Sequence, residues 1–239
     1  TEPFFLYLAL NATHGPNHAT AADLAKAGGN RIKAMTIALD RAVGRVLDAL
    51  DAHGLAGQTL VLFLNDNGGA AGHNNAPLKG HKGSTWEGGI RVPFLARWPG
   101  VIPAGQVCDA PVIALDLFPT VLAAAGIDGT PGKPLDGKNL LPLMKGETKE
   151  RPHQTLFWKT NKPWAVRDGD LKLVGGNPGQ DDGAALFDLA ADKGETKNLA
   201  NDRPEDVRRL RALYQQWAAE IQPTPWAGAA KPGARKAAR

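Results

Sequence analysis

The amino-acid sequence predicts an α/β fold, with a parallel sheet covered by helices and then a small antiparallel sheet with a closing helix. Residues 3–10 and 59–65 are near-continuous apolar runs of strand length, typical of strands that are covered on both faces. Between them, apolar residues recur at helical spacing from Asn30 to His53. Strand, crossover helix and strand make a βαβ unit, the building block of parallel sheets.

The next elements follow in chain order. Gly54 stands where the first long helix is expected to stop, because glycine tolerates the left-handed backbone of a helix C-terminus. Residues 92–98 predict a further strand, and residues 114–126 predict a helix that ends at Gly126. The chain then becomes rich in proline and glycine, which indicates a loop-rich connection.

The C-terminal part predicts short strands and one helix. Residues 164–174 favour a hairpin that turns at Asp168-Gly169, and residues 185–189 favour another strand. Asp202 is expected to cap the last helix, and Pro204 suits its first turn. The apolar stripe of this helix is expected to pack against the sheet, and it consists of Val207, Leu210, Tyr214, Trp217 and Ile221.

Composition and charge exclude several classes of protein. The chain has 239 residues, of which 43% are hydrophobic and 22% charged, so it is expected to fold rather than to be disordered. The net charge is +4, but four cations and no acid lie in residues 229–239, a tail that we expect to be flexible. The body mixes both signs, which argues against a nucleic-acid partner. No apolar run has the length of a membrane span.

Polar residues follow the two predicted parallel strands. His14 lies a few residues after the first strand, and Asp66 and Asn67 directly follow the second. Because ligands bind beyond the carboxyl ends of parallel strands, we expect these residues to share one edge of the sheet. An acid and an amide suit a hard cation such as Ca²⁺ or Mg²⁺, although two ligands are too few for either ion. The same residues are common in simple turns, and spacing alone favours the turn.

A glycine-rich segment, GHKGSTWEGG, follows at residues 80–89. It presents the Lys82 ammonium where glycines let the backbone approach a ligand, a weak indication of anion binding that does not match the phosphate-loop pattern. His73 and His81 are candidates for the wall of a pocket, with a loop-stabilising role as the alternative for His73. Trp86 and Glu87 are expected to be structural.

Taken together, these segments resemble the type I sulfatases of the alkaline phosphatase superfamily, over most of the chain from Pro3 to about Ile221. The matching segments are PFFLYLALNATHGP, LVLFLNDNGG, PLKGHKGSTWEGGIRVPFLARWPG, DAPVIALDLFPTVLAAAGI, LDGKNLLPLMKG and LFDLAADKGETKNLA. The block that runs from the lysine to the paired glycines after Asp-Asn-Gly-Gly is the most specific of these. The resemblance implies an alkaline-phosphatase-like fold and favours a metal site at Asp66 and Asn67 over a simple turn.

The resemblance also implies a mechanism. Such enzymes use a formylglycine nucleophile, made from Cys or Ser in a C/S-x-P-x-R motif, and a Ca²⁺ ion, which we expect here ahead of Mg²⁺. Asp66 and Asn67 would be metal ligands, and Asp66 would also take the proton of the nucleophile. Lys82 would contact a sulfate oxygen, and His14 would act as general acid at the ester oxygen. A periplasmic or secreted location is implied as well.

The sequence departs from the family pattern, since the upstream metal-binding aspartates and the upstream Arg, Lys and His of the family's pocket are absent. It contains no C/S-x-P-x-R motif, and Cys108 lies in QVCDAP, so it is not a formylglycine precursor. We therefore expect residues 1–126 to be the C-terminal half of the catalytic domain and residues 127–228 to be the connecting loop and a small α+β subdomain. The expected partners are the missing N-terminal portion of the protein and a sulfated small molecule or carbohydrate. On this interpretation the chain alone is inactive.

Two alternatives stay open at this stage. A phosphodiesterase or phosphonate hydrolase of the same superfamily would use the same layout of nucleophile and metal. A non-catalytic sulfatase-like binding protein would keep the fold and the cation but not the reaction.

Overall fold

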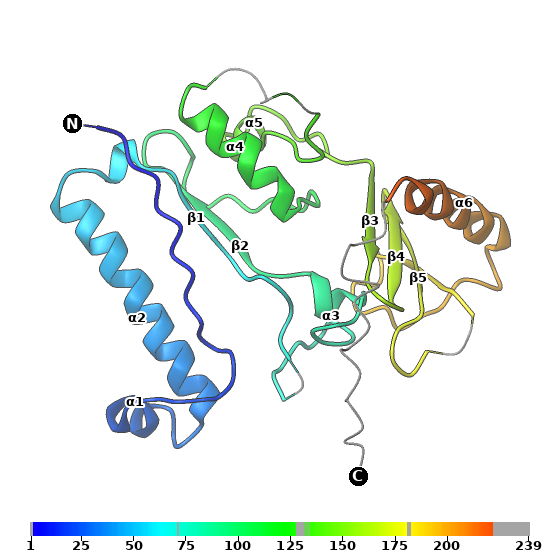
Figure 1. The fold of residues 1–239 in the computed structure, drawn as a ribbon, viewed down its shortest axis with the longest axis horizontal. Coiled ribbons are helices and arrows are strands. Elements are labelled where there is room, and N and C mark those ends of the chain that lie inside the picture. Colours follow the sequence, from blue (N-terminus) through cyan, green and yellow to red (C-terminus); the bar gives the residue numbers. More distant parts are fainter. Residues whose placement is uncertain (1, 71, 128–131, 133, 181–182, 222–239) are drawn as a thin grey trace, which may run out of the picture. The chain divides into compact units, whose positions relative to one another are not determined.

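The computed structural model describes residues 2–70, 72–127, 132, 134–180 and 183–221 of the chain (Figure 1). These fall into two compact units. The first unit comprises Thr1–Asn65 and Pro93–Pro152, and the second comprises Asp66–Val92 and His153–Arg239. The segment that carries the predicted metal ligands therefore groups with the C-terminal sheet. The predicted basic tail at 229–239 lies outside the described residues.

Two helices open the first unit. α1 (Ala21–Lys26) packs against the long helix α2 (Arg31–Ala52). The Asn30 side chain caps α2 by accepting a hydrogen bond from the Lys33 N–H at 2.9 Å. Gly54 follows the helix with a φ of 67°, a left-handed conformation that favours glycine. The helix predicted from Asn30 to His53 is thus confirmed.

The sheet of the first unit is antiparallel. After a 3-10 turn (Ala56–Gln58), β1 (Val61–Leu64) pairs with β2 (Phe94–Arg97). Among the described residues no parallel pair is found, and residues 3–10 form no strand. The expected parallel partner of β1 is therefore not formed by that segment.

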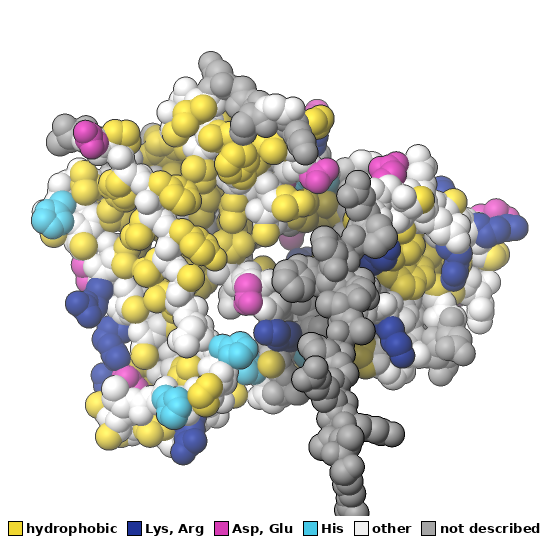
Figure 2. Space-filling model, in the orientation of Figure 1, with side chains coloured by type: hydrophobic (Ala, Val, Ile, Leu, Met, Phe, Trp, Pro, Cys, Tyr) yellow, Lys and Arg dark blue, Asp and Glu magenta, His cyan; other side chains and the backbone are white. Residues whose placement is uncertain are grey.

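Residues 3–10 have the apolar composition of a strand covered on both faces, but no described element covers them. The side chains of Phe5 and Tyr7 are 76% and 82% exposed, because no described strand lies on them. Hydrophobic side chains are also exposed elsewhere on the first unit (Figure 2), among them Leu95 and Phe118. Apolar patterning predicts that a segment is covered but does not identify the element that covers it.

The rest of the first unit contains α4 (Leu117–Ala124), which follows a 3-10 turn (Ala114–Asp116), and α5 (Leu141–Met144). Gly126 has a φ of 67° just after α4, as predicted for the end of that helix. The buried Asp116 carboxylate accepts hydrogen bonds from the Ile113 N–H at 2.8 Å and the Lys138 N–H at 2.7 Å. One carboxylate thus anchors the loop-rich connection that follows the helix.

The second unit contains a four-stranded antiparallel sheet in the order β3–β4–β5–β6. Its strands are Thr155–Lys159, Trp164–Asp168, Leu171–Gly175 and Ala185–Asp188. The predicted hairpin is confirmed, since Asp168 pairs with Leu171 and Gly169 has a φ of 60°. This sheet supports the short helix α3 (Glu87–Ile90), which belongs to the same unit.

The terminal helix α6 (Pro204–Glu220) packs over β4 and β5 (Figure 1). Leu210 is fully buried against the sheet, and Trp217 stacks on Phe157 with ring centroids 4.8 Å apart, so the helical part of the predicted apolar stripe is confirmed as packing surface. The prediction is wrong for Ile221, because this residue lies after the last helical residue and is 37% exposed. The predicted cap is wrong. Arg203 occupies the N-cap position directly before Pro204, which places Asp202 one residue too early. None of the described helices is apolar over the length that a bilayer requires.

Candidate active-site segment

Two glycine-rich segments of the second unit are hydrogen-bonded to each other. The Gly68 N–H donates to the Gly89 carbonyl at 2.9 Å, and the Lys82 N–H donates to the Gly69 carbonyl at 3.0 Å. A Cβ on Gly68 would lie 1.9 Å from the Gly88 carbonyl oxygen, so only glycine permits this approach. The backbone of the acid-amide pair and the backbone of the lysine segment are therefore held side by side.

The Asn75 side chain reinforces this arrangement. Its amide oxygen accepts a hydrogen bond from the Gly69 N–H at 3.0 Å, and its amide nitrogen donates to the Gly69 and Gly80 carbonyls at 3.0 and 3.2 Å. One half-buried side chain thus connects the start and the end of the loop. Sequence reasoning missed Asn75, because an asparagine in a glycine-rich stretch is equally typical of a turn.

Asp66 and Asn67 offer free oxygen atoms. Asp66 is exposed and Asn67 is half-buried, and neither side chain has a hydrogen-bonding partner within the described part of the chain. Carboxylate and amide oxygens are hard donors, which fits Ca²⁺ or Mg²⁺. Nowhere in the described ranges do three or more His, Cys, Asp or Glu side chains gather as a ligand group. The donor chemistry of these two residues therefore fits a hard cation, but two donors are too few to complete its coordination.

The histidines of the loop turn toward nearby backbone. His81 Nδ1 lies 2.9 Å from the Lys82 carbonyl oxygen, and His73 Nδ1 lies 3.3 Å from the Ala70 carbonyl oxygen. Both contacts are local, as expected for loop-stabilising side chains. The Lys82 side chain is exposed and has no ion-pair partner among the described residues, so its ammonium is free to meet an anion.

His14 belongs to the other unit. It is exposed, and its Nδ1 lies 2.7 Å from the Gly15 carbonyl oxygen, which leaves Nε2 available. Five of the six predicted site residues lie in the second unit, namely Asp66, Asn67, His73, His81 and Lys82. The shared edge predicted for His14 stays a prediction.

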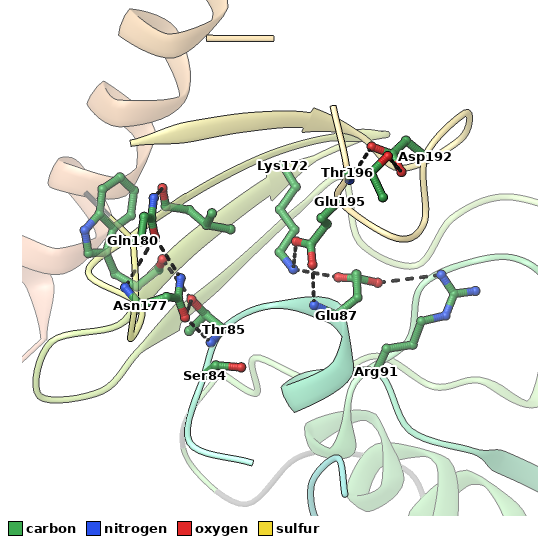
Figure 3. Close-up of polar contacts among 12 residues, drawn as sticks. Ser84, Thr85, Glu87, Arg91, Lys172, Asn177, Gln180, Asp192, Glu195 and Thr196 are labelled. Carbon is green, nitrogen blue, oxygen red and sulfur yellow. Dashed lines mark hydrogen bonds and ion pairs between the residues drawn. The ribbon is translucent and has the colours of Figure 1, made fainter. Parts of the chain in front are cut away.

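A buried ion cluster fixes the C-terminal end of the lysine segment to the sheet (Figure 3). The Lys172 ammonium, on β5, is fully buried and lies 2.7 Å from Glu87 Oε1 and 2.9 Å from Glu195 Oε1. The Glu87 N–H, at the start of α3, donates to Glu195 Oε2 at 2.7 Å. Since α3 contains the paired glycines Gly88 and Gly89, this cluster determines where the segment that contacts Gly68 lies.

In this cluster two carboxylates share one buried ammonium, and one residue, Glu195, has a strained backbone. Two carboxylates face one buried ammonium, and Arg91 Nη1 lies 3.6 Å from Glu87 Oε2 on the other side. Burial raises the pKa of Glu195, while the nearby charge of Lys172 opposes that rise. Glu195 also has a φ of 54°, which is unfavourable for a residue with a Cβ. The hydrogen bond from Glu87 N–H and the ion pair hold Glu195 in this conformation.

A second polar network joins the same segment to the loop after β5. The Asn177 amide oxygen accepts hydrogen bonds from the Thr85 N–H at 2.7 Å and the Thr85 hydroxyl at 3.1 Å. The Asn177 amide nitrogen donates to Gln180 Oε1 at 3.2 Å (Figure 3). Trp86, between these two networks, is buried against Phe187 with ring centroids 5.6 Å apart. The structural roles expected for Trp86 and Glu87 are thus confirmed.

Family models and known proteins give a consistent identification. The Sulfatase family model matches residues 1–127, and the model for the C-terminal part of N-sulphoglucosamine sulphohydrolase matches residues 81–218. N-acetylgalactosamine-6-sulfatase of Sus scrofa is 39% identical over 72% of this chain and 34% of its own length. Steryl-sulfatase of Rattus norvegicus is 39% identical over 66% of this chain and 29% of its own length.

The crystal structure of Ps i-CgsB in complex with k-i-k-neocarrahexaose superposes with a TM-score of 0.83 at 35% identity, over 92% of this chain and 51% of that one. This match confirms the predicted alkaline-phosphatase-like α/β fold class. The chain spans about a third of the length of the curated relatives and about half of that solved structure. Because the Sulfatase family model alone covers more than half of the chain, the chain belongs to the sulfatase family.

Proposed function

We propose that the complete protein hydrolyses sulfate esters, with a formylglycine nucleophile that an upstream segment supplies. The formylglycine would supply the nucleophilic oxygen that receives the sulfur as the bond between sulfur and the ester oxygen breaks. The ester oxygen would leave as an alcohol after it gains a proton, and inorganic sulfate would be released as the aldehyde forms again. Membership of the sulfatase family supports the reaction type.

The observation that carries the proposal is the pairing of the two glycine-rich segments. The hydrogen bond from Lys82 N–H to the Gly69 carbonyl brings a lysine segment next to the acid-amide pair Asp66 and Asn67. Oxygen donors for a cation and an ammonium for an anion are thereby presented by one compact piece of chain. A sulfate ester bound to a divalent cation needs both.

Each residue has a distinct role in this proposal. Asp66 and Asn67 would hold Ca²⁺, which when bound supplies positive charge against the sulfate oxygens. Asp66 would also take the proton of the nucleophile. Lys82 would hydrogen-bond a sulfate oxygen and stabilise negative charge as the ester bond breaks. His14 would donate the proton to the leaving oxygen through Nε2, since Nδ1 already contacts the Gly15 carbonyl.

The decisive experiment measures hydrolysis of p-nitrophenyl sulfate by the full-length protein, with mass spectrometry to confirm the formylglycine. We expect turnover that EDTA abolishes and Ca²⁺ restores. Lys82→Ala is expected to lower kcat by about 10²- to 10³-fold, and His14→Ala by about 10²- to 10⁴-fold. Lys197→Ala is the matched control, because Lys197 is an exposed lysine of the second unit outside this segment.

Two results would redirect the proposal. Hydrolysis of bis-p-nitrophenyl phosphate, with no hydrolysis of sulfate esters, would favour the phosphodiesterase alternative. No turnover of either ester or of carbohydrate sulfates by protein with a confirmed formylglycine would favour a binding role. Periplasmic or secreted location is part of the proposal through the family resemblance, and cell fractionation tests it.

A further inference from the structure

Asn75 lies in the loop that joins the acid-amide pair to the lysine segment, and both ends of its side-chain amide are used within that loop. The amide oxygen accepts a hydrogen bond from the Gly69 N–H at 3.0 Å, and the amide nitrogen donates to the Gly69 and Gly80 carbonyls at 3.0 and 3.2 Å. Gly69 closely follows Asn67 in the sequence, and Gly80 closely precedes Lys82. One side chain therefore bonds to the backbone on both sides of the proposed site.

The pattern of these bonds requires an amide at position 75. A backbone N–H faces the amide oxygen of Asn75, and two backbone carbonyls face its amide nitrogen. A carboxylate in this place would set a negative oxygen against both carbonyls. An alanine would remove this partner from the Gly69 N–H and from the Gly80 carbonyl, and both glycines are half-buried. Neither replacement can keep all three bonds.

The backbone around Asn75 is packed closely. A Cβ on Gly69 would lie 2.6 Å from Asn75 Oδ1 and 2.7 Å from His73 Cβ, so glycine is what lets the amide approach. On the other side, a Cβ on Gly88 would lie 2.5 Å from the Gly80 carbonyl oxygen. Asn75 is thus enclosed by backbone that cannot move closer, and its three bonds determine the spacing of the strands of loop around it.

Lys82 depends on this spacing through its backbone. Its side chain is exposed and has no hydrogen-bonding or ion-pair partner among the described residues, so no side-chain contact there fixes the ammonium. The Lys82 N–H donates to the Gly69 carbonyl, the same oxygen that accepts from the Asn75 amide nitrogen. The position from which the ammonium extends is therefore set by a carbonyl that Asn75 holds in place.

We propose that Asn75 is a positioning residue, which holds Lys82 in register with Asp66 and Asn67 so that an ammonium and a bound cation meet the same sulfate group. The inference rests on the proposed sulfate-ester hydrolysis and adds to it a residue that touches neither the cation nor the ester. A displacement of catalytic groups by about 1 Å can lower a rate on the order of 10²-fold, so a side chain that acts only on the backbone can matter for turnover.

Hydrogen–deuterium exchange of the full-length protein, followed by mass spectrometry, tests this role without turnover. In Asn75→Ala, peptides that contain Gly69 or Lys82 are expected to exchange about tenfold faster, because the two segments lose hydrogen bonds that join them. Peptides from α2 and β5 should exchange as in the parent protein, which distinguishes local opening from global unfolding.

Two further variants sharpen the exchange measurement. Asn74→Ala is the matched control, because Asn74 is an exposed asparagine of the same loop whose amide oxygen accepts from the Ala76 N–H instead. Asn75→Asp keeps the size of the side chain and the acceptor for the Gly69 N–H but loses the donor. It should therefore accelerate exchange as Asn75→Ala does, and it decides the question even where Asn75→Ala does not fold.

A double-mutant cycle tests whether Asn75 acts through Lys82. With p-nitrophenyl sulfate and saturating Ca²⁺, Asn75→Ala is expected to lower kcat by about 10- to 10²-fold in the parent protein. In protein that already carries Lys82→Ala, it should lower kcat by less than about twofold, since there is no ammonium left to misplace. A residue that only stabilised the fold would lower kcat by the same factor in both backgrounds.

The possible failures are distinguishable. Unchanged exchange at Gly69 and Lys82 would overturn the inference, and so would equal losses of kcat in the two backgrounds. If the parent protein hydrolyses no sulfate ester despite a confirmed formylglycine, the proposed reaction fails, and the exchange measurement alone decides whether Asn75 holds the two segments in register.

Discussion

Replacement of Lys172 by methionine tests the buried ion cluster most directly. Methionine approximates the aliphatic part of lysine, so the variant removes the charge with little change in packing. Glu87 and Glu195 then lose the ammonium that lies 2.7 and 2.9 Å from their carboxylates. Neither carboxylate can turn to solvent, because the Glu87 side chain is 5% exposed and that of Glu195 is fully buried.

The expected cost follows from this geometry. Removal of one partner of a buried ion pair typically destabilises a protein by about 3–5 kcal/mol, because it leaves charge that is buried and uncompensated. Arg91 offsets little of this, because its guanidinium is partly exposed and lies 3.6 Å from Glu87, on the side away from Lys172. We therefore expect a loss of about 3–5 kcal/mol, a large fraction of the roughly 5–15 kcal/mol that stabilises a typical domain.

Urea unfolding of the full-length protein, followed by tryptophan fluorescence, measures this loss. Trp86 and Trp158 pack in the core cluster beside Lys172, so their emission reports on this region. Lys197→Met is the matched control, and as an exposed substitution it should change the free energy of unfolding by less than about 0.5 kcal/mol. A Lys172→Met variant as stable as this control would refute the view that the cluster anchors the lysine segment.

Further predictions concern the glycine contact and two titrating carboxylates. Gly68→Ala should destabilise the protein by at least about 1–3 kcal/mol and lower the proposed hydrolysis of sulfate esters, because its Cβ would lie 1.9 Å from the Gly88 carbonyl oxygen. Gly44→Ala, in the middle of α2 with no atom within 4 Å of its Cβ, should instead raise stability by about 0.5–1 kcal/mol in the same urea assay. Because the pKa of Glu195 is raised, the free energy of unfolding should decrease as the pH rises from 4.5, the ordinary pKa of a glutamate, through the raised value. Glu195→Gln should make this decrease smaller, as measured by urea midpoints over the same pH range. The hydrogen bond from Arg41 lowers the pKa of Asp23, so the stability that this ionised carboxylate contributes is present above pH 3.8 and is lost as the pH falls further. Asp23→Asn should therefore lower the urea midpoint at neutral pH, and the midpoints of the variant and the parent protein should become equal in acid.

The predictions for Gly68, Glu195 and Asp23 each have an outcome that contradicts them. A Gly68→Ala variant with parental stability would mean that the two glycine-rich segments separate without cost. A Glu195→Gln variant with an unchanged pH profile would mean that another group governs the decline. An Asp23→Asn difference that stays constant down to acidic pH would assign its effect to something other than the titrating carboxylate.

Local patterns predicted α2, α4, α6 and the hairpin of this chain, but not the short helices α1, α3 and α5. The helical spacing of apolar residues identified α2, and Gly54 and Asp168-Gly169 marked a helix end and a turn because these positions need a left-handed backbone. Pairing between strands was not predictable in the same way. The apolar run at residues 3–10 indicated a covered strand, yet its direction and its partner depend on elements that periodicity does not reveal.

The sequence likewise predicted some contacts of the candidate site and missed others. The sequence indicated that the acid-amide pair and Lys82 belong together, and the hydrogen bond from the Lys82 N–H to the Gly69 carbonyl agrees. It gave little sign of Lys172, since a lysine in a strand is normally read as solvent-exposed. Its burial depends on Glu87, which lies 85 residues earlier in the chain. Such a partner becomes apparent only when the chain is folded.

The anchoring of the lysine segment to β5 limits how the segment can be exchanged between relatives. A chimera that imports only residues 66–92 from another sulfatase would replace Glu87 and Thr85, the residues that Lys172 and Asn177 bind in this chain. Substrate preference should therefore be transferable between relatives only when the matching residues of the β4–β6 sheet are exchanged together with residues 66–92.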